Sequence, residues 1–87
     1  MYSLFFLKKA KAEFKRIDPI WQKRIQSKLE ILTSNPVLLK NQIKPLKGKQ
    51  GLASLRVGSY RVIFQKKNKE LIILIIRVSH RRKVYRK

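Results

Sequence analysis

The sequence predicts an α/β (α+β) fold in which an N-terminal strand and a helical hairpin pack on a twisted, mainly antiparallel sheet of about four strands. Three observations support this. Apolar residues recur at helical spacing in the first part of the chain, the period falls to two after residue 51, and 44% of the 87 residues are hydrophobic, enough for a core. A chain of this length is expected to form one domain over residues 1–87.

The N-terminal third begins with a strand pattern and continues with two helical ones. Residues 2–7 are apolar and aromatic, and an amphipathic helix is predicted from Leu7 to about Ile17. Asp18 and Pro19 suit the cap and the first turn of a second helix. The chain's second proline ends that helix, because the residue before a proline disfavours helical geometry.

The second half is predicted to be a meander of three strands. Residues 36–51 hold two prolines, two glycines and four lysines, which indicates a loop. The period of two then predicts strands over 52–57, 60–66 and 71–78, joined by a tight turn at Gly58-Ser59 and a second turn over 67–70.

These turns fix an expected register. The first pairs Val57 with Tyr60, and the second is expected to pair Lys66 with Leu71. The predicted core face is then Ala53, Leu55, Val57, Tyr60, Val62, Phe64, Leu71, Ile73 and Ile75. The opposite face is predicted to carry Leu52, Ser54, Arg56, Arg61, Ile63, Gln65, Ile72, Leu74, Ile76, Val78 and, if the strand continues, His80.

Charge is the dominant feature of the composition. The chain has 23 Lys and Arg against 4 Asp and Glu, a net charge of +19, and residues 40–87 alone carry +14 because only Glu70 offsets fifteen basic residues. So basic a surface attracts nucleic acid or an anionic membrane. The longest apolar run, residues 71–76, is far shorter than the roughly 20 residues that span a bilayer. No export signal is recognisable either, so a cytoplasmic protein is expected.

The composition also disfavours a metal site or a disulfide framework. The chain has no cysteine, one histidine and four carboxylates, so no metal and no cofactor are expected.

Arg56 and Arg61 form the most specific candidate site on the sheet. The expected register places Arg56 directly opposite Arg61, and like charges in that position destabilise a sheet. An opposed pair of arginines with no nearby carboxylate is suited to bind an anion. Guanidinium groups bind phosphate through paired donors. The alternative is that both arginines point into solvent, or that one of them meets a carboxylate from the helices. The carboxylates available there are Glu13, Asp18 and Glu30.

The basic C-terminal tail offers two groups that could move protons. Histidine titrates near neutrality, so His80 is one candidate, and surrounding cations could make Tyr85 the other. His80 could equally be an ordinary strand-end histidine, and Tyr85 a ring that packs the tail onto the sheet.

Two C-terminal motifs resemble the RelE branch of the RelE/ParE toxin superfamily. They are Leu55-Arg56-Val57-Gly58-Ser59-Tyr60-Arg61-Val62-Ile63-Phe64 and Arg77-Val78-Ser79-His80-Arg81-Arg82-Lys83-Val84-Tyr85-Arg86. Leu46-Lys47-Gly48 and the strand–helix–helix opening are also similar to that family. The resemblance implies a RelE-like fold and a ribosome-dependent endoribonuclease. Such an enzyme cleaves mRNA in the ribosomal A site, without metal, by attack of the 2′-hydroxyl on the adjacent phosphate.

The resemblance also implies roles for particular residues. Arg61 matches an arginine that contacts the scissile phosphate, Arg81 or Arg82 matches a second one, and Tyr85 matches a tyrosine proposed for proton transfer. Arg56 matches a basic strand residue near the site. The expected catalytic set is therefore Arg61, Arg81, Tyr85 and His80, and the expected RNA-binding set is Arg56, Arg82, Lys47, Lys49 and Lys83.

One departure from the family pattern concerns proton transfer. The best-known members carry two lysines at the positions occupied here by Leu52 and Ser54, and His80 or Lys49 could substitute for them. The expected partners are mRNA on the ribosome and an acidic antitoxin, with the free protein a monomer and no membrane involved. A ParE-like inhibitor of DNA gyrase and a non-catalytic RNA- or ribosome-binding module are the alternative functions.

Overall fold

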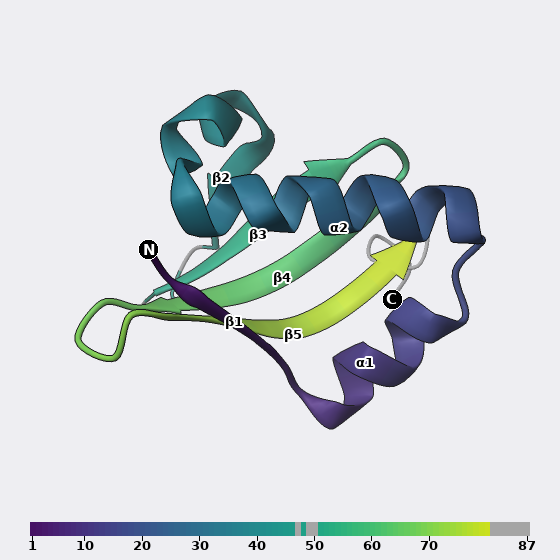
Figure 1. Ribbon diagram of the computed structural model, residues 1–87, viewed down its shortest axis with the longest axis horizontal. Coiled ribbons are helices and arrows are strands. Elements are labelled where there is room, and N and C mark those ends of the chain that lie inside the picture. The colour runs from purple at the N-terminus through teal and green to yellow at the C-terminus, as the bar shows by residue number, and fades with distance from the viewer. Residues whose placement is uncertain (47, 49–50, 81–87) are drawn as a thin grey trace.

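The computed structural model describes residues 1–46, 48 and 51–80, and it confirms the α/β fold with one more strand than expected (Figure 1). The elements follow the order β1 (Ser3–Phe6), α1 (Lys8–Lys15), α2 (Pro19–Ser34), the 3₁₀ helix η1 (Pro36–Gln42), β2 (Ile43–Pro45), β3 (Leu52–Val57), β4 (Tyr60–Lys67) and β5 (Ile72–His80).

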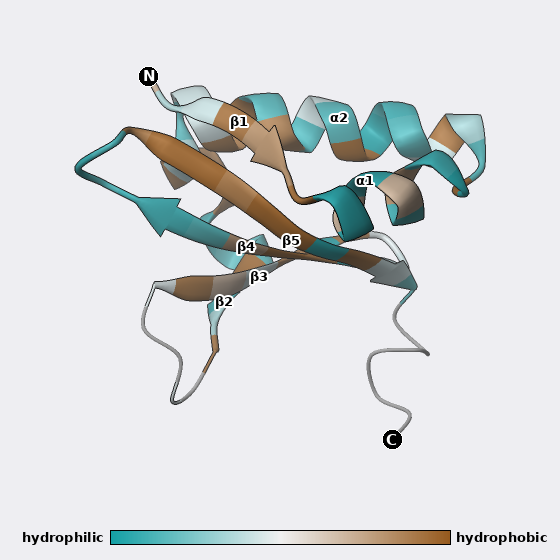
Figure 2. Cartoon of the chain, turned by 90° about the horizontal axis from the view of Figure 1, so that it is seen from below, coloured by the Kyte–Doolittle hydropathy of each residue, from teal (hydrophilic) through white to brown (hydrophobic). Residues whose placement is uncertain are grey.

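The strands form one sheet in the order β1-β5-β4-β3-β2, antiparallel except for the parallel pair β1 and β5. Helix α2 lies across one face of this sheet and α1 lies beside β5, as Figures 1 and 2 show. The other face is not covered by any helix that the structure describes. The sheet therefore has a helix face and an open face.

Local sequence signals explain the second helix. The Asp18 carboxylate accepts a hydrogen bond of 3.0 Å from the backbone N–H of Ile20, and Pro19 occupies the first turn, as predicted. Ile25, Leu29 and Leu32 follow at intervals of three or four residues, and all three side chains are buried against the sheet.

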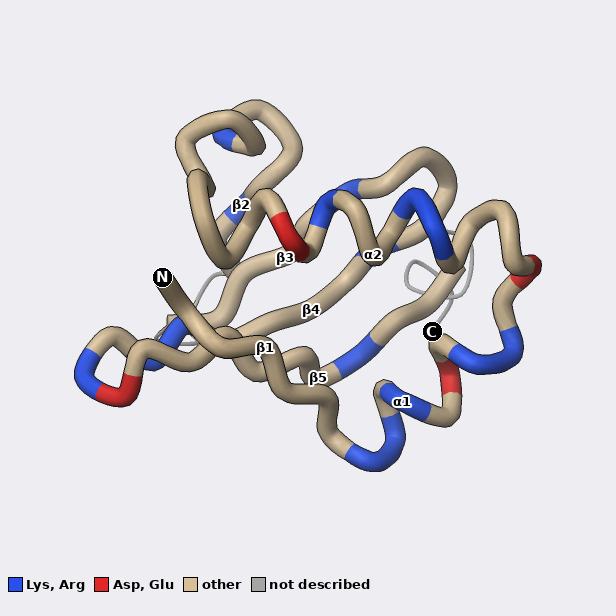
Figure 3. The backbone as a smooth tube through the Cα atoms, in the orientation of Figure 1, with Lys and Arg blue, Asp and Glu red and all other residues tan. Residues whose placement is uncertain are grey.

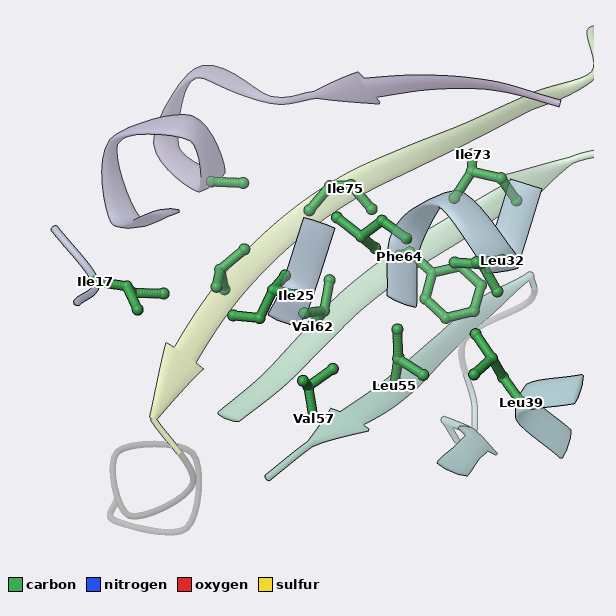
Figure 4. Close-up of a cluster of buried hydrophobic side chains, with 13 residues drawn as sticks. Ile17, Ile25, Leu32, Leu39, Leu55, Val57, Val62, Phe64, Ile73 and Ile75 are labelled. Carbon is green, nitrogen blue, oxygen red and sulfur yellow. The ribbon is translucent and has the colours of Figure 1, made fainter. Parts of the chain in front are cut away.

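The core lies between α2 and the helix face of the sheet (Figure 4). Leu55, Val62 and Ile75 supply its centre from three neighbouring strands, and each is 0% exposed. Leu39 of η1 closes one end of the core. A fully buried Leu, Ile or Val contributes roughly 1.5–3 kcal/mol, so this apolar layer holds the two helices on the sheet.

The first hairpin has the predicted register, with Val57 opposite Tyr60 and Arg56 opposite Arg61. Gly58 has a φ of +59°, the left-handed conformation that a two-residue hairpin turn requires. The Trp21 ring also packs directly on Gly58, leaving no room there for a Cβ atom. The turn therefore packs against Trp21 of α2 in a contact that only glycine permits.

The predicted register of the second hairpin is wrong. Lys66 lies opposite Ile73, not Leu71, because β4 extends to Lys67 and the loop occupies residues 68–71. Leu71 sits in this loop at a φ of +56° with 50% of its surface exposed, so it is not part of the core. The shift is by two residues, so Ile73 stays on the helix face as predicted.

A β-bulge in β5 then places the residues that follow it on the opposite face of the sheet from the one predicted. Phe64 pairs with Ile75 but Ile63 pairs with Arg77, which leaves Ile76 as an extra residue. Val78 is consequently on the helix face and 2% exposed, where the sequence had predicted the open face.

His80 is displaced in the same way. It lies opposite Tyr60, two residues beyond Val78, and so it shares the helix face. The prediction that His80 follows the open face was therefore wrong.

The segment predicted as a loop over residues 36–51 contains further structure. Its first part forms η1, and Ile43–Pro45 forms the edge strand β2, paired with β3. A strand of three residues that carries a lysine and a proline exposes little edge for unwanted pairing. Proline is also tolerated at an edge because it lacks a donor N–H.

The Glu13 side chain of α1 hydrogen-bonds to the last part of β5. Its carboxylate accepts hydrogen bonds from the backbone N–H of Val78 at 2.8 Å and from Arg77 Nε at 2.9 Å. The first part of β5 is paired with β1. Beyond the bulge, the Glu13 side chain of α1 supplies the hydrogen-bond acceptor in place of a neighbouring strand.

Glu13→Ala is expected to lower the free energy of unfolding by about 1–3 kcal/mol, because it leaves the partly buried Val78 N–H without its acceptor. Urea denaturation would measure the loss. Glu30→Ala, which removes the same charge from an exposed position on α2, is the control and should change stability by about 0.5 kcal/mol or less. Equal losses in the two variants would show that Glu13 acts only through overall charge.

Candidate phosphate-binding site

The predicted arginine pair lies on the open face of the sheet. Arg56 of β3 and Arg61 of β4 are direct cross-strand partners, and Arg61 is in turn opposite Ser79 of β5. Directly opposed residues hold their Cβ atoms about 4.5–5.5 Å apart. The sheet backbone therefore holds the bases of the two arginine side chains side by side, so both guanidinium groups can reach one anion.

A pocket of about 200 Å³ opens beside this pair. Among the described residues its lining combines three cations with neutral polar groups and contains no carboxylate: Asn41, Gln42, Ile43, Lys44, Ser54, Arg56 and Arg61. Three strands and η1 meet there, so the site is assembled from segments far apart in the sequence.

Two carboxylates that could have neutralised the arginine pair have other partners. Glu13 binds Arg77 and the Val78 backbone, and Asp18 caps α2. Figure 3 shows Lys and Arg along both helices with few acidic residues between them. The field around the pocket is therefore positive, and phosphate, like carboxylate, is an anion whose oxygens fit paired guanidinium donors.

A second, larger pocket of about 550 Å³ adjoins the first and shares Gln42 and Arg56 with it. It runs along α2, where Arg24 stacks over the Trp21 ring at 5.0 Å from the ring centroid. Arg24 and Lys28 give this pocket a basic wall one helical turn long. This second pocket is a basic trough along α2 that meets the first pocket at Gln42 and Arg56.

His80 does not join this site. Its ring packs edge-on against Tyr60, with 5.2 Å between ring centroids, and Tyr60 packs against Trp21 at 5.6 Å. This aromatic row lies on the helix face, whereas Arg61 is on the open face.

Six of the expected site residues lie outside the part of the chain that the structure describes. They are Lys47, Lys49, Arg81, Arg82, Lys83 and Tyr85, and Arg86 beside them lies outside it as well. Their expected roles stay predictions.

Lys44, Asn41 and Gln42 are pocket residues that the sequence did not single out. All three lie in the segment predicted as a loop, and β2 brings Lys44 opposite Ser54. The single apolar residue in Ile43-Lys44-Pro45 is too weak a signal for a strand of three residues.

Comparison with solved structures places this fold among RelE-type toxins. The intact RelBE toxin–antitoxin complex of E. coli matches with a TM-score of 0.79 at 20% identity, covering 92% of this chain and 96% of that one. The RelB–RelE complex of Methanococcus jannaschii matches with a TM-score of 0.76 at 28% identity, covering 93% and 94%. The RelE–RelB complex of Pyrococcus horikoshii matches with a TM-score of 0.78 at 24% identity, covering 92% and 94%.

The family follows from the sequence match. Residues 4–85 match the model of the ParE toxin of the type II toxin–antitoxin system parDE, so the chain belongs to this family, within the RelE/ParE superfamily. It is a toxin of a type II toxin–antitoxin system. No curated protein gives a significant sequence match. Within the described residues, no helix is long and apolar enough to cross a membrane.

Proposed function

We propose that this toxin is a metal-independent endoribonuclease that cleaves mRNA, in the ribosomal A site, by attack of a 2′-hydroxyl on the adjacent phosphate. The observation that carries the proposal is the pair Arg56 and Arg61, held side by side in a pocket whose described lining has no carboxylate. In such a reaction negative charge grows on the phosphate oxygens, and donors fixed in advance at that position lower the barrier.

The proposed roles follow from position and resemblance. Arg61 and Arg56 hold the scissile phosphate, with Arg81 or Arg82 as a further cation, and Tyr85 takes part in proton transfer. The basic trough along α2 guides the strand that flanks the phosphate. Lys47, Lys49 and Lys83 add to the attraction for RNA.

The partners proposed for the chain are mRNA on the ribosome and an acidic antitoxin. Three of the similar structures are toxins solved in complex with RelB-type antitoxins. A surface of net charge +19 suits an acidic segment that folds as it binds. We further propose that the free toxin is a monomer and acts in the cytoplasm, where ribosomes are.

A ParE-like inhibitor of DNA gyrase is the second candidate, because the matching family model is that of ParE. Expression of the toxin without its antitoxin separates the two. An endoribonuclease arrests growth with cleaved mRNA and normal DNA supercoiling, and Tyr85→Phe relieves the arrest. Intact mRNA with stalled supercoiling would establish the gyrase function instead.

A further inference from the structure

We propose that Lys44 is a catalytic residue of this toxin, the general acid that protonates the leaving 5′-oxygen when the phosphodiester is cut. The inference rests on the proposed endoribonuclease function and names one of its proton-transfer groups. It starts from the position of Lys44 on β2, a strand that the sequence did not predict.

The register places Lys44 on the same face as the arginine pair. Lys44 is the cross-strand partner of Ser54, and Ser54 is two residues from Arg56 on β3, so all three side chains emerge on the open face. Lys44 also lines the pocket that contains Arg56 and Arg61. A group bound by the two arginines therefore lies within reach of a long lysine side chain from the neighbouring strand.

Ser54 leaves room for this approach. Its side chain is small, so the residue next to Lys44 takes up little of the pocket that it lines. Lys44 itself is exposed, and its ammonium can therefore turn toward a bound strand at little energetic cost. Pro45 follows Lys44 and restricts the backbone at the end of β2.

The chemistry singles out Lys44 among the described residues of the pocket. The guanidinium groups of Arg56 and Arg61 bind charge but hold their protons throughout a reaction. The amides of Asn41 and Gln42 and the hydroxyl of Ser54 are poor acids. An ammonium group donates hydrogen bonds and can also give up a proton as negative charge builds on an adjacent oxygen.

The proposed step is balanced in atoms and charge. The 2′-oxygen forms a bond to phosphorus and loses its proton, which reaches water by way of the proton-transfer residue named under the proposed function, while the bond from phosphorus to the 5′-oxygen breaks. That oxygen takes a proton from Lys44 Nζ and leaves as a hydroxyl, and the neutral amine is reprotonated by solvent. The products are a 2′,3′-cyclic phosphate and a 5′-hydroxyl end.

Two substitutions separate proton donation from phosphate binding. Lys44→Gln removes both the charge and the proton, whereas Lys44→Arg keeps the charge and withholds the proton. In single-turnover cleavage of mRNA on programmed ribosomes, both variants should lower the saturating rate by about 10²–10⁴-fold. Lys44→Arg should leave the toxin concentration at half-saturation unchanged. The matched controls are Lys69→Arg and Lys69→Gln in the exposed β4–β5 loop, which should leave the rate unchanged.

A modified substrate gives the decisive readout. When sulfur replaces the bridging 5′-oxygen, the leaving thiolate needs no proton. Both Lys44 variants should then cut this mRNA within a few-fold of the wild-type rate. The assignment would be overturned if the Lys44 variants lose the same factor in cleavage rate on the oxygen and the sulfur substrates. It would also be overturned if Lys44→Arg cleaves the normal mRNA as fast as the wild type. If the wild-type toxin cuts neither mRNA, the proposed function fails, and the role of Lys44 with it.

Discussion

Arg61→Gln is expected to lower the saturating rate of mRNA cleavage on programmed ribosomes by about 10²–10³-fold, the usual effect of removing one fixed donor from a developing negative charge. Arg61 lies between Arg56 and Ser79 in the sheet, so its guanidinium cannot be replaced by a small shift of a neighbouring strand. Growth arrest on expression should be relieved to a corresponding degree.

Two further variants define what Arg61 contributes. Arg61→Lys keeps the charge but loses the planar pair of N–H donors, so it should retain an intermediate rate. Lys69→Gln removes one charge from the exposed β4–β5 loop and should leave the rate unchanged. If Arg61→Gln folds normally and cleaves at the wild-type rate, the arginine pair is not the phosphate site.

Gly58→Ala should lower the free energy of unfolding by about 2–5 kcal/mol, more than the same change at either of the other two glycines. Two costs combine. A non-glycine residue at a φ of +59° loses about 1–2 kcal/mol, and the overlap of the new Cβ with the Trp21 ring adds about 1–3 kcal/mol. Thermal and urea denaturation would measure the change.

Gly48→Ala is the matched control, because Gly48 has a φ of +72° but nothing lies within 4 Å of its added Cβ. It should show the backbone cost alone. In a Trp21→Ala background, Gly58→Ala should likewise fall to that smaller cost. Equal losses for Gly58→Ala and Gly48→Ala in the wild-type background would contradict the packing of Trp21 on the turn.

The sequence predicted well those parts of the fold that are set by short-range signals. The Asp18-Pro19 start of α2 and the Gly58-Ser59 turn each depend on residues adjacent in the chain, and both are where they were expected. The correct turn in itself places Arg56 beside Arg61. That part of the candidate site could therefore be obtained from the sequence.

The errors arose where the structure depends on contacts between distant segments. The bulge at Ile76 is compensated by α1, whose Glu13 binds Val78 and Arg77, and nothing near Ile76 in the sequence indicates it. The same bulge moves His80 to the helix face.

Strand β2 shows the same limit. Three residues carry too little pattern to predict a strand, and Ile43–Pro45 is a strand because β3 is present to pair with it. Lys44 enters the pocket only through that pairing. Lys44, the residue proposed as the proton donor, therefore could not be identified from the local sequence.

The most direct test of the proposed function is the fate of an mRNA that carries a single 2′-deoxynucleotide at the position where the toxin cuts on the ribosome. Attack by the 2′-hydroxyl predicts that the all-ribose mRNA yields fragments ending in a 2′,3′-cyclic phosphate and a 5′-hydroxyl. It also predicts that the deoxy substitution abolishes cleavage at that site. Cleavage of the substituted mRNA at an undiminished rate, or fragments with a 5′-phosphate, would contradict the account.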